Sequence, residues 1–444
     1  MHIKEINTPH QEWDTIQQIL YNRGMDIKKI PQYINLNHTV VNNPLLLGAE
    51  LLKKGCQQLF SIINENKTVF LIVDCDCDGY MSAALFINYL YELFPTWVTS
   101  KLTWWMHEDK QHGLQDCIDK AKTYDMVVCI DGASNDWDEQ KQLADLNIPV
   151  LILDHHLITN DEVSSSSAII INNQHSDYPN KEFCGCGIAW QFCRYIDELL
   201  HIENANNFLD LVAIANIGDM MNLQSFETRY LISLGLRKEN IHNPFLNYIL
   251  DKNSFPLSKS DYVSNDKDMA CTPMGAAFFI VPFINATTRS GTIEEKKLIF
   301  KALLTSEAFT RIPEIKRGKK TGKEELLVLQ AIRTIGNVKN RQTRAEERGL
   351  ELLELLIKEN NLLDNSILLF TLENDVAIDS NIKGLVANKL AAKYQRPCLV
   401  LSRKDNEYIG SMRGYIKTGI ESFKTILEQC PEINWVQGQH HFLK

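Results

Sequence analysis

Three short apolar runs in the first half of the chain are each followed at once by an aspartate. The runs span residues 69–73, 126–130 and 150–153. Apolar runs of this length without polar alternation are typical of strands that are buried on both faces. Helical patterns follow at residues 82–93 and 137–146. This alternation predicts right-handed crossovers and a parallel sheet, so the expected fold class is α/β.

The first of these runs ends in an unusual alternation of acids and cysteines, Asp74-Cys75-Asp76-Cys77-Asp78, followed by a glycine. If the strand continues through this stretch, its side chains point alternately to opposite sides. The three carboxylates are then expected on one side, and the two thiols are expected to point away from them into the core. Carboxylates this close repel one another, and a divalent cation is the usual compensation.

More acids and two histidines occupy equivalent positions. Asp131 follows the second run, Asp154-His155-His156 closes the third, and Asp219 ends an apolar stretch that is expected to be helical. The carboxyl ends of parallel strands meet at one edge of a sheet, where ligands bind. Carboxylate and imidazole ligands without thiolate favour manganese or magnesium over zinc. With one acid shared between two ions, such a site would hydrolyse phosphate esters. Each motif alone is compatible with an ordinary turn or helix cap, but their conjunction favours a metal site.

Taken together, these motifs resemble those of the DHH phosphoesterase superfamily, and others resemble its RecJ-like branch of single-strand-specific exonucleases. The resemblance covers about residues 44–440. Its further motifs are a glycine-rich helix start at 184–190, a segment at 210–220, a Pro-x-Ile-Asn-Ala segment at 282–291, and two C-terminal stretches at 382–397 and 410–414. A loop at 107–114 also resembles a family loop near the site. The resemblance implies a parallel-sheet DHH domain joined by a long helix to a smaller α/β DHH-associated C-terminal domain.

The resemblance also implies roles for individual residues. The implied metal ligands for two Mn2+ or Mg2+ ions are Asp74, Asp76, Asp78, Asp131, His155 and Asp219. Asp76 and Asp78 would each favour a different ion, and Asp131 would bridge the two. Asp74 would be either an additional ligand or an acid outside the ligand shell. Asp154 would orient the first histidine, as carboxylates behind metal-bound histidines commonly do.

Catalysis and substrate binding would involve residues from both ends of the chain. The implied catalytic residues are Asp131, His155, His156 and Arg289. The implied substrate-binding residues are His156, Asn285, Arg289, Arg413, Gly438 and His440. The two arginines would hold phosphates as bidentate donors. Four aromatic residues could stack on bases, with core packing as the alternative, namely Tyr80, Trp104, Trp105 and Trp190.

Four parts are expected along the chain. They are a helical N-terminal lead-in at 1–65, the DHH catalytic domain at 66–312, a basic linker and connecting helix at 313–360, and the C-terminal substrate-binding domain at 361–444. Within the linker, residues 313–323 are expected to form a mobile connection, and the long helical pattern is expected to be interrupted at Gly336. The last residues depart from the family's glycine-rich motif, and no room is left for an added oligonucleotide-binding fold. A compact, phage-type or truncated member is therefore expected.

Composition limits the choice of partners and compartment. A net charge of −10 argues against a basic coat over the whole protein, so nucleic acid would need local positive patches. One candidate patch is Arg311, Lys316, Arg317, Lys319, Lys320 and Lys323. The eleven cysteines form no paired Cys-x-x-Cys motif, and free buried thiols fit a reducing cytoplasm. No signal peptide and no membrane-spanning apolar stretch is recognised, so a cytoplasmic protein without membrane contact is expected.

The favoured hypothesis is a metal-dependent hydrolase of phosphodiester bonds in single-stranded DNA. The resemblance implies an exonuclease of 5′ to 3′ polarity that acts in DNA repair and recombination. A second hypothesis keeps the chemistry and changes the substrate to short RNA oligonucleotides or cyclic dinucleotides. A third is a non-catalytic DNA-binding assembly subunit, which the complete set of ligand positions disfavours.

Overall fold

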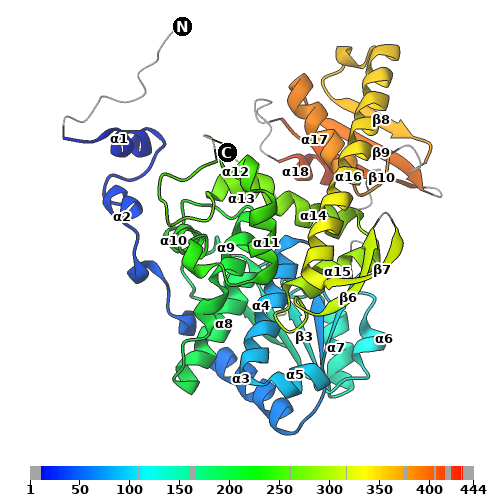
Figure 1. Ribbon diagram of the computed structural model, residues 1–444. Helices are drawn as coiled ribbons and strands as arrows, with labels where there is room; N and C mark the ends of the chain where they lie inside the picture. The colour runs from blue at the N-terminus through cyan, green and yellow to red at the C-terminus, as the bar shows by residue number, and fades with distance from the viewer. Residues whose placement is uncertain are drawn as a thin grey trace. The chain divides into compact units, whose positions relative to one another are not determined.

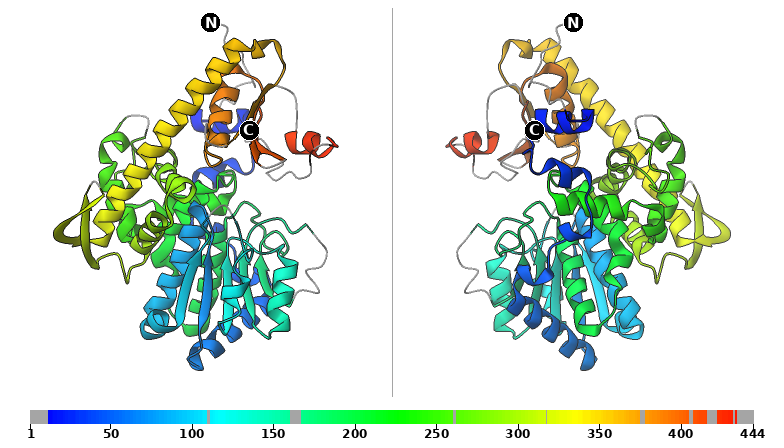
Figure 2. Two further views of the ribbon diagram at one scale, coloured as in Figure 1. Left: turned by 90° about the vertical axis from the view of Figure 1, so that its right-hand side faces the viewer. Right: turned by 90° about the vertical axis from the view of Figure 1, so that its left-hand side faces the viewer.

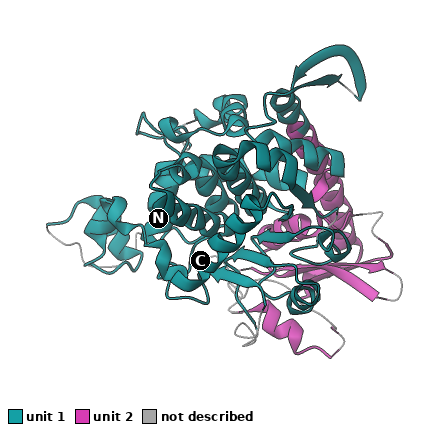
Figure 3. Ribbon diagram, turned by 90° about the horizontal axis from the view of Figure 1, so that it is seen from below, with its two compact units in different colours: residues 1–288, 292–334 teal, residues 289–291, 335–444 magenta. Residues whose placement is uncertain are grey.

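The structure is a computed structural model. It describes residues 12–108, 111–159, 167–259, 262–316, 318–374, 378–404, 407–415, 422–431 and 433. The chain divides into two compact units, residues 1–288 with 292–334 and residues 289–291 with 335–444 (Figure 3). Among the described residues, no helix has both the length and the apolar composition that crossing a bilayer requires.

A five-stranded sheet forms the centre of the first unit. Its strands are β1 (Val69–Val73), β2 (Leu102–Met106), β3 (Met126–Ile130), β4 (Val150–Asp154) and β5 (Ile169–Asn172). They are ordered β2-β1-β3-β4-β5, and every neighbouring pair is parallel. All residues of β1, β3 and β4 are buried, as continuous apolar runs predict. The α/β fold with a parallel sheet is confirmed.

Helices cover both faces of this sheet (Figure 1). On one face, Phe70 and Ile72 of β1 join a buried cluster with Leu143 of α7 (Trp137–Asp145) and Ala121 of α6 (Ile118–Ala121). The other face is covered by α3 (Ala49–Asn64), α4 (Cys77–Leu93) and α8 (Gly185–Leu200). Because each face of the strands is apolar and covered, the polar atoms of this layer are confined to the strand ends.

The first unit contains many further helices. They are α1 (Thr15–Asn22), α2 (Ile30–Ile34), α5 (Pro95–Lys101), α9 (Leu209–Gly218), α10 (Phe226–Gly235), α11 (Pro244–Lys252), α12 (Ser254–Leu257), α13 (Pro273–Phe279), α14 (Val281–Ser290) and α15 (Ile293–Leu303), with short 3-10 turns at His38–Val40, Pro44–Leu47, Ala205–Phe208 and Lys238–Asn240. The last residues of α14 belong to the second unit. The described residues before 65 form α1, α2, α3 and two 3-10 turns, and the lead-in as a separate part of the chain stays a prediction.

The second unit contains a three-stranded sheet and most of the long helix α16 (Leu327–Glu359). The first residues of α16 belong to the first unit. The sheet consists of β8 (Leu368–Leu372), β9 (Cys398–Lys404) and β10 (Glu407–Arg413), in the order β10-β9-β8. β8 and β9 are parallel, while β9 and β10 are antiparallel. Its helices are α17 (Lys383–Tyr394) and α18 (Phe423–Glu428), with a 3-10 turn at Leu362–Asp364. Buried and exposed residues alternate along β8, so this sheet has one covered face.

Two expectations about the linker were wrong. The described residues of 313–323 lie in a hairpin of β6 (Arg311–Lys316) and β7 (Lys319–Leu326), which in both views of Figure 2 stands away from the five-stranded sheet. Gly318 and Gly322 both have a positive φ and open space around them, Gly318 in the hairpin turn and Gly322 within β7, where the pairing register shifts. Helix α16 also runs 33 residues without a break at Gly336. The domain boundaries at 65, 312 and 360 stay predictions.

Candidate metal centre

The turn after β1 brings three aspartates together, though not in the way the sequence suggested. Helix α4 begins at Cys77, so the strand ends before the acids, and the expected alternation along a strand was wrong. Asp76 is the N-cap residue of this helix, and its Oδ1 accepts a hydrogen bond of 3.0 Å from the Gly79 amide. A Cβ at Gly79 would lie 2.5 Å from Cβ of Asp74, so only glycine allows this tight first turn.

Asp78 lies in the first turn of α4 and is held by a second helix. Its carboxylate accepts hydrogen bonds from the amides of Gly185 (2.7 Å) and Cys186 (2.9 Å), at the N-terminus of α8. Amides at a helix N-terminus stabilise a carboxylate through direct bonds and through the helix dipole. A Cβ at Gly185 would lie 2.7 Å from Asp131 Oδ1, so glycine at this position lets α8 approach both acids.

Asp131 follows β3 and adopts a positive φ of 67°, a conformation that aspartate tolerates better than most residues. Its Oδ1 lies 3.1 Å from Nε2 of His155, which follows β4. The same imidazole nitrogen lies 3.8 Å from Oδ2 of Asp78 and 3.6 Å from Oδ2 of Asp219, the residue after α9. Four residues from four different elements therefore converge on one buried point.

Two oxygen atoms at this point lack hydrogen-bond partners in the described structure. Oδ1 of Asp131 and Oδ2 of Asp219 are buried and accept no hydrogen bond. Burial and the neighbouring carboxylates raise the pKa of Asp131 well above its ordinary value. The same causes raise the pKa of Asp219 to about 8 and that of Asp76 to about 6. Burial and the nearby His156 lower the pKa of His155, which favours the neutral imidazole that binds metals.

His156, next in the chain, has a different environment. Its Nδ1 donates to Oδ1 of Asp154 at 2.8 Å, and its side chain is 56% exposed. Burial opposes the positive charge, but the Asp154 carboxylate outweighs it and raises the pKa of His156 to about 9. Asp154 is fully buried, and it also accepts hydrogen bonds from the amides of His155 and Ser134. Asp154 was predicted to orient the His155 side chain. In the structure its carboxylate contacts the backbone amide of His155 and the imidazole of His156.

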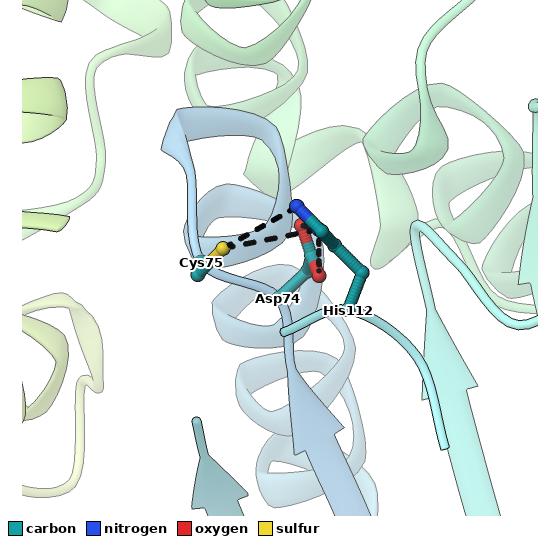
Figure 4. Close-up of side chains that lie close together, drawn as sticks. All are labelled: Asp74, Cys75 and His112. Atoms are coloured by element: carbon teal, nitrogen blue, oxygen red, sulfur yellow. Dashed lines mark hydrogen bonds and ion pairs between the residues drawn. The ribbon is translucent and has the colours of Figure 1, made fainter. Parts of the chain in front are cut away.

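The third carboxylate of the turn, Asp74, is buried and pairs with a histidine that the sequence analysis did not assign. Nδ1 of His112 lies 2.8 Å and 3.0 Å from the two oxygens of Asp74 (Figure 4). The Cys75 sulfur lies 3.8 Å from both ring nitrogens of His112, so the expectation that its thiol points away from the acids was wrong. Cys77 is buried in the core as expected. The resemblance of loop 107–114 to a family loop was the available signal for His112.

The side chains that could hold metal ions form overlapping groups. Within each group the ligand atoms lie within 4.8 Å of one another, and the groups are Asp78-His155-Asp219, Asp131-His155-His156, Asp74-Asp76-Asp131 and Asp74-Cys75-His112. The structure thus brings all six predicted metal ligands into one cluster in the first unit. Asp131 belongs to two of the groups, as the predicted bridging role requires.

Of the predicted substrate-binding residues, His156 belongs to this cluster, and the others lie on other parts of the chain. Asn285 is on α14, with its Oδ1 buried and without a hydrogen-bond partner in the described residues. Arg289 and Arg413 belong to the second unit, where neither has a carboxylate partner among the described residues. Burial and the charge of Arg289 lower the pKa of Arg413. Gly438 and His440 lie outside the described residues.

Of the four aromatic residues that could stack on bases, two are fully buried and two are partly buried. Tyr80 and Trp190 are 1% and 2% exposed, so both are core residues and are closed to a nucleic acid. Trp104 and Trp105 are partly buried on β2, where Trp104 packs against Phe300 with ring centroids 4.8 Å apart.

Comparison with known proteins gives consistent results. Residues 68–216 match the model of the DHH family, N-terminal domain. Over 99% of its length, the chain is 32% identical to the SPbeta prophage-derived protein YorK of Bacillus subtilis strain 168, provisionally named a single-strand DNA-specific exonuclease, and it covers 72% of that protein. It is also 23% identical to the single-stranded-DNA-specific exonuclease RecJ of the same strain, over 94% of this chain and 48% of RecJ.

Solved structures show the same fold. Exonuclease RecJ bound to manganese matches with a TM-score of 0.61 and 16% identity, over 79% of this chain and 80% of that one. RecJ from Thermus thermophilus in complex with Mn2+ matches with a TM-score of 0.64 and 16% identity, over 86% of this chain and 49% of that one. At this level of identity the similarity establishes the fold.

Proposed function

Since the chain belongs to the DHH family and is homologous to the RecJ exonucleases, we propose that it is a divalent-metal-dependent hydrolase of phosphodiester bonds in single-stranded DNA. The observation that carries this proposal is the pair of buried, unpartnered oxygens on Asp131 and Asp219, on either side of His155. Buried carboxylate oxygens without donors are costly, and a bound cation removes that cost.

The residues present fit two hard cations. Asp78, Asp219 and His155 form one group of donors, and Asp74, Asp76 and Asp131 form a second. Oxygen-rich donor sets with an imidazole suit manganese or magnesium. When bound, such ions polarise the phosphate and stabilise the oxygens that enter and leave phosphorus. Relatives of this fold solved with Mn2+ support the choice of metal.

The chain's own residues position the substrate and control charge. His156 is exposed beside the carboxylates and its pKa is raised to about 9, so it carries a positive charge at neutral pH and suits a phosphate oxygen. Asp154 fixes that imidazole and hence its protonated nitrogen. Arg289 and Arg413 are assigned to phosphates farther along the strand, because guanidinium groups bind phosphate in a bidentate manner.

We assign the substrate as single-stranded DNA, with removal of nucleotides in the 5′ to 3′ direction. Support for single strands comes from the names of the relatives. The direction rests on the family resemblance alone, because the described residues contain no feature that distinguishes one strand end from the other.

The test is digestion of single-stranded DNA labelled at either end, with Mn2+ present, and with a matched duplex and a dinucleotide alongside. Release of nucleotides from the single strand, with loss of the 5′ label first, is the expected result. Cleavage of the dinucleotide alone would move the protein to the small-substrate hypothesis. DNA binding without any cleavage would favour the assembly-subunit hypothesis and refute hydrolysis.

A further inference from the structure

We propose that Asp74, Cys75 and His112 form a binding site for a thiophilic divalent ion of the zinc class, beside the carboxylate centre. Asp74 and Cys75 come from the turn between β1 and α4, and His112 comes from the loop after β2 (Figure 4). One oxygen, the sulfur and one ring nitrogen lie within 4.8 Å of one another. No role in the proposed hydrolysis requires a sulfur atom here, so the proposal goes beyond that function.

The donor types differ from those of the main centre. The groups around Asp131 and His155 offer only oxygen and nitrogen atoms, which suit hard ions. The Asp74 group adds a thiol, and a carboxylate, an imidazole and a thiolate together form a donor set that zinc commonly takes in proteins. Two adjacent donor sets of different softness would select different metals from one solution.

The distances also suit a small tetrahedral ion. Bonds of about 2.0 Å to nitrogen and oxygen and about 2.3 Å to sulfur place tetrahedral ligands roughly 3.3–3.6 Å apart. Here His112 Nδ1 lies 2.8 Å from Asp74 Oδ1 and 3.8 Å from the Cys75 sulfur. Side-chain shifts of about half an ångström would therefore admit the ion. In its absence, the imidazole and carboxylate form the hydrogen bond that the structure shows.

The loop that carries His112 is fixed on the side of the site. His107 is buried, and its Nε2 lies 3.0 Å from the Gly113 carbonyl oxygen. Gly113 has a φ of 60°, and a Cβ there would lie 2.2 Å from the carboxylate of Asp136, which accepts a hydrogen bond from the Leu114 amide. These hydrogen bonds fix the backbone directly after His112, and this fixed backbone places the imidazole beside Asp74.

Access distinguishes Cys75 from the other thiols. Of the eleven cysteines, nine are buried, and only Cys75 and Cys430 are partly exposed. The His112 side chain is 51% exposed, so an ion from solvent can reach both. Asp74 also belongs to the group with Asp76 and Asp131, so an ion bound to Cys75 and His112 would compete with the main centre for one carboxylate.

The experiment uses Co2+ as a spectroscopic substitute for zinc, added to the full, metal-stripped chain with a thiol-free reductant. Thiolate bound to cobalt absorbs strongly in the near ultraviolet, whereas oxygen and nitrogen ligands give no such band. We expect a saturable band whose final intensity corresponds to one thiolate-bound cobalt ion per chain. The band should be abolished in Cys75→Ser, need more Co2+ in His112→Asn, and be unchanged in the matched control Cys430→Ser. Zinc added afterwards is expected to displace the band.

An absent band in the unmodified chain, or an equal band in Cys75→Ser, would overturn the proposal. If Cys75→Ser fails to fold, as judged by circular dichroism, His112→Asn alone decides, and an unchanged Co2+ titration in that variant refutes the site. Asp219→Asn separates this inference from the proposed hydrolysis, because it damages the main centre and is expected to keep the band. Loss of the band in Asp219→Asn would show that the sulfur responds to the main centre and would also refute a separate site.

Discussion

Two sets of carboxylates in the first unit differ in what balances their charge. Asp154 and Asp74 each have an imidazole nitrogen at 2.8 Å. Asp131 and Asp219 each have a buried oxygen with no hydrogen-bond partner in the described structure. We call Asp131 and Asp219 the incomplete set, because these two oxygens have no hydrogen-bond donor among the described residues. Within one cluster, acids that hold a histidine side chain thus lie beside acids with unpartnered oxygens that suit the cation we propose, and Asp74 is of both kinds because it also belongs to two candidate metal groups.

The pKa shifts follow the same division. Burial alone would raise the pKa of Asp154, but the positive charge of His156 reverses the effect and lowers it below the ordinary value. The imidazole nearest to Asp131 and Asp219 is that of His155, whose own pKa is lowered, so burial and the acidic neighbours prevail and raise the pKa values of both acids. Both sets contain buried acids, so the opposite pKa shifts come from the charged groups beside each carboxylate and not from a difference in burial.

The largest expected loss of activity comes from a substitution of Asp131, the member of the incomplete set that belongs to two of the candidate metal groups. Asp131→Asn keeps the size of the side chain and tolerates the positive φ, so the fold is expected to persist. Hydrolysis of single-stranded DNA should fall by at least about a thousandfold, because the carboxylate charge is lost where charge develops. Rates measured under single-turnover conditions in Mn2+ test this. A variant that keeps more than about a tenth of the activity would contradict the role of Asp131.

The two adjacent histidines offer the next contrast. His156→Ala should lower the rate by about a hundredfold to ten-thousandfold, since it removes a positioned proton donor, yet leave Mn2+ affinity nearly unchanged. His155→Ala should weaken Mn2+ binding as well, because His155 lies among the unpartnered acids. Calorimetric titration of Mn2+ into both variants separates the two roles. Equal loss of affinity in the two variants would show that the division between the histidines is wrong.

Much of the fold was predictable because the relevant signals are local. The continuous apolar runs at β1, β3 and β4 predicted buried parallel strands, and they lie side by side in the sheet. Strands β2 and β5 were not predicted. β2 contains two tryptophans and exposes a face, and β5 is a four-residue edge strand whose run of three isoleucines is shorter than the three runs that were recognised.

The site was predictable in its membership and less so in its geometry. The six ligand positions were named from motifs, and they do converge. The alternation of acids and cysteines suggested a strand, but the three aspartates meet at the start of a helix. The alternation could not show this, because Gly79 permits an immediate turn into α4. The partner of Asp74 was missed for a different reason: His112 is 38 residues away, and only tertiary structure brings it there.

The stability of the metal-free protein should depend on pH because of Asp219, a member of the incomplete set. Asp219 has its pKa raised from 3.8 to about 8 in the folded state, so the folded chain binds a proton that the unfolded chain has lost. The free energy of unfolding should therefore fall as pH rises through the window from about 4 to about 8. Thermal melts with a chelator, repeated with Mn2+, measure the effect.

Mn2+ should reduce this pH dependence, since a bound cation favours the ionised carboxylate. The matched variant Asp219→Asn should lose part of the dependence even without metal. A metal-free protein whose stability rises over the same pH window would contradict the assignment of Asp219 to the incomplete set.

The smallest expected effect concerns a hydroxyl group beside the incomplete set. Ser82 is fully buried, and its Oγ lies 2.7 Å from the Asp78 carbonyl oxygen and 3.1 Å from Oδ1 of the same residue. Ser82→Ala should cost about 1 kcal/mol of stability and lower activity only a few-fold, because the amides of Gly185 and Cys186 still hold the carboxylate. The matched control is Ser100→Ala, which removes a similar bond to a carbonyl four residues earlier, on the exposed helix α5. If Ser82→Ala abolished Mn2+ binding while Ser100→Ala was neutral, Asp78 would depend on its hydroxyl neighbour and not on the N-terminus of α8.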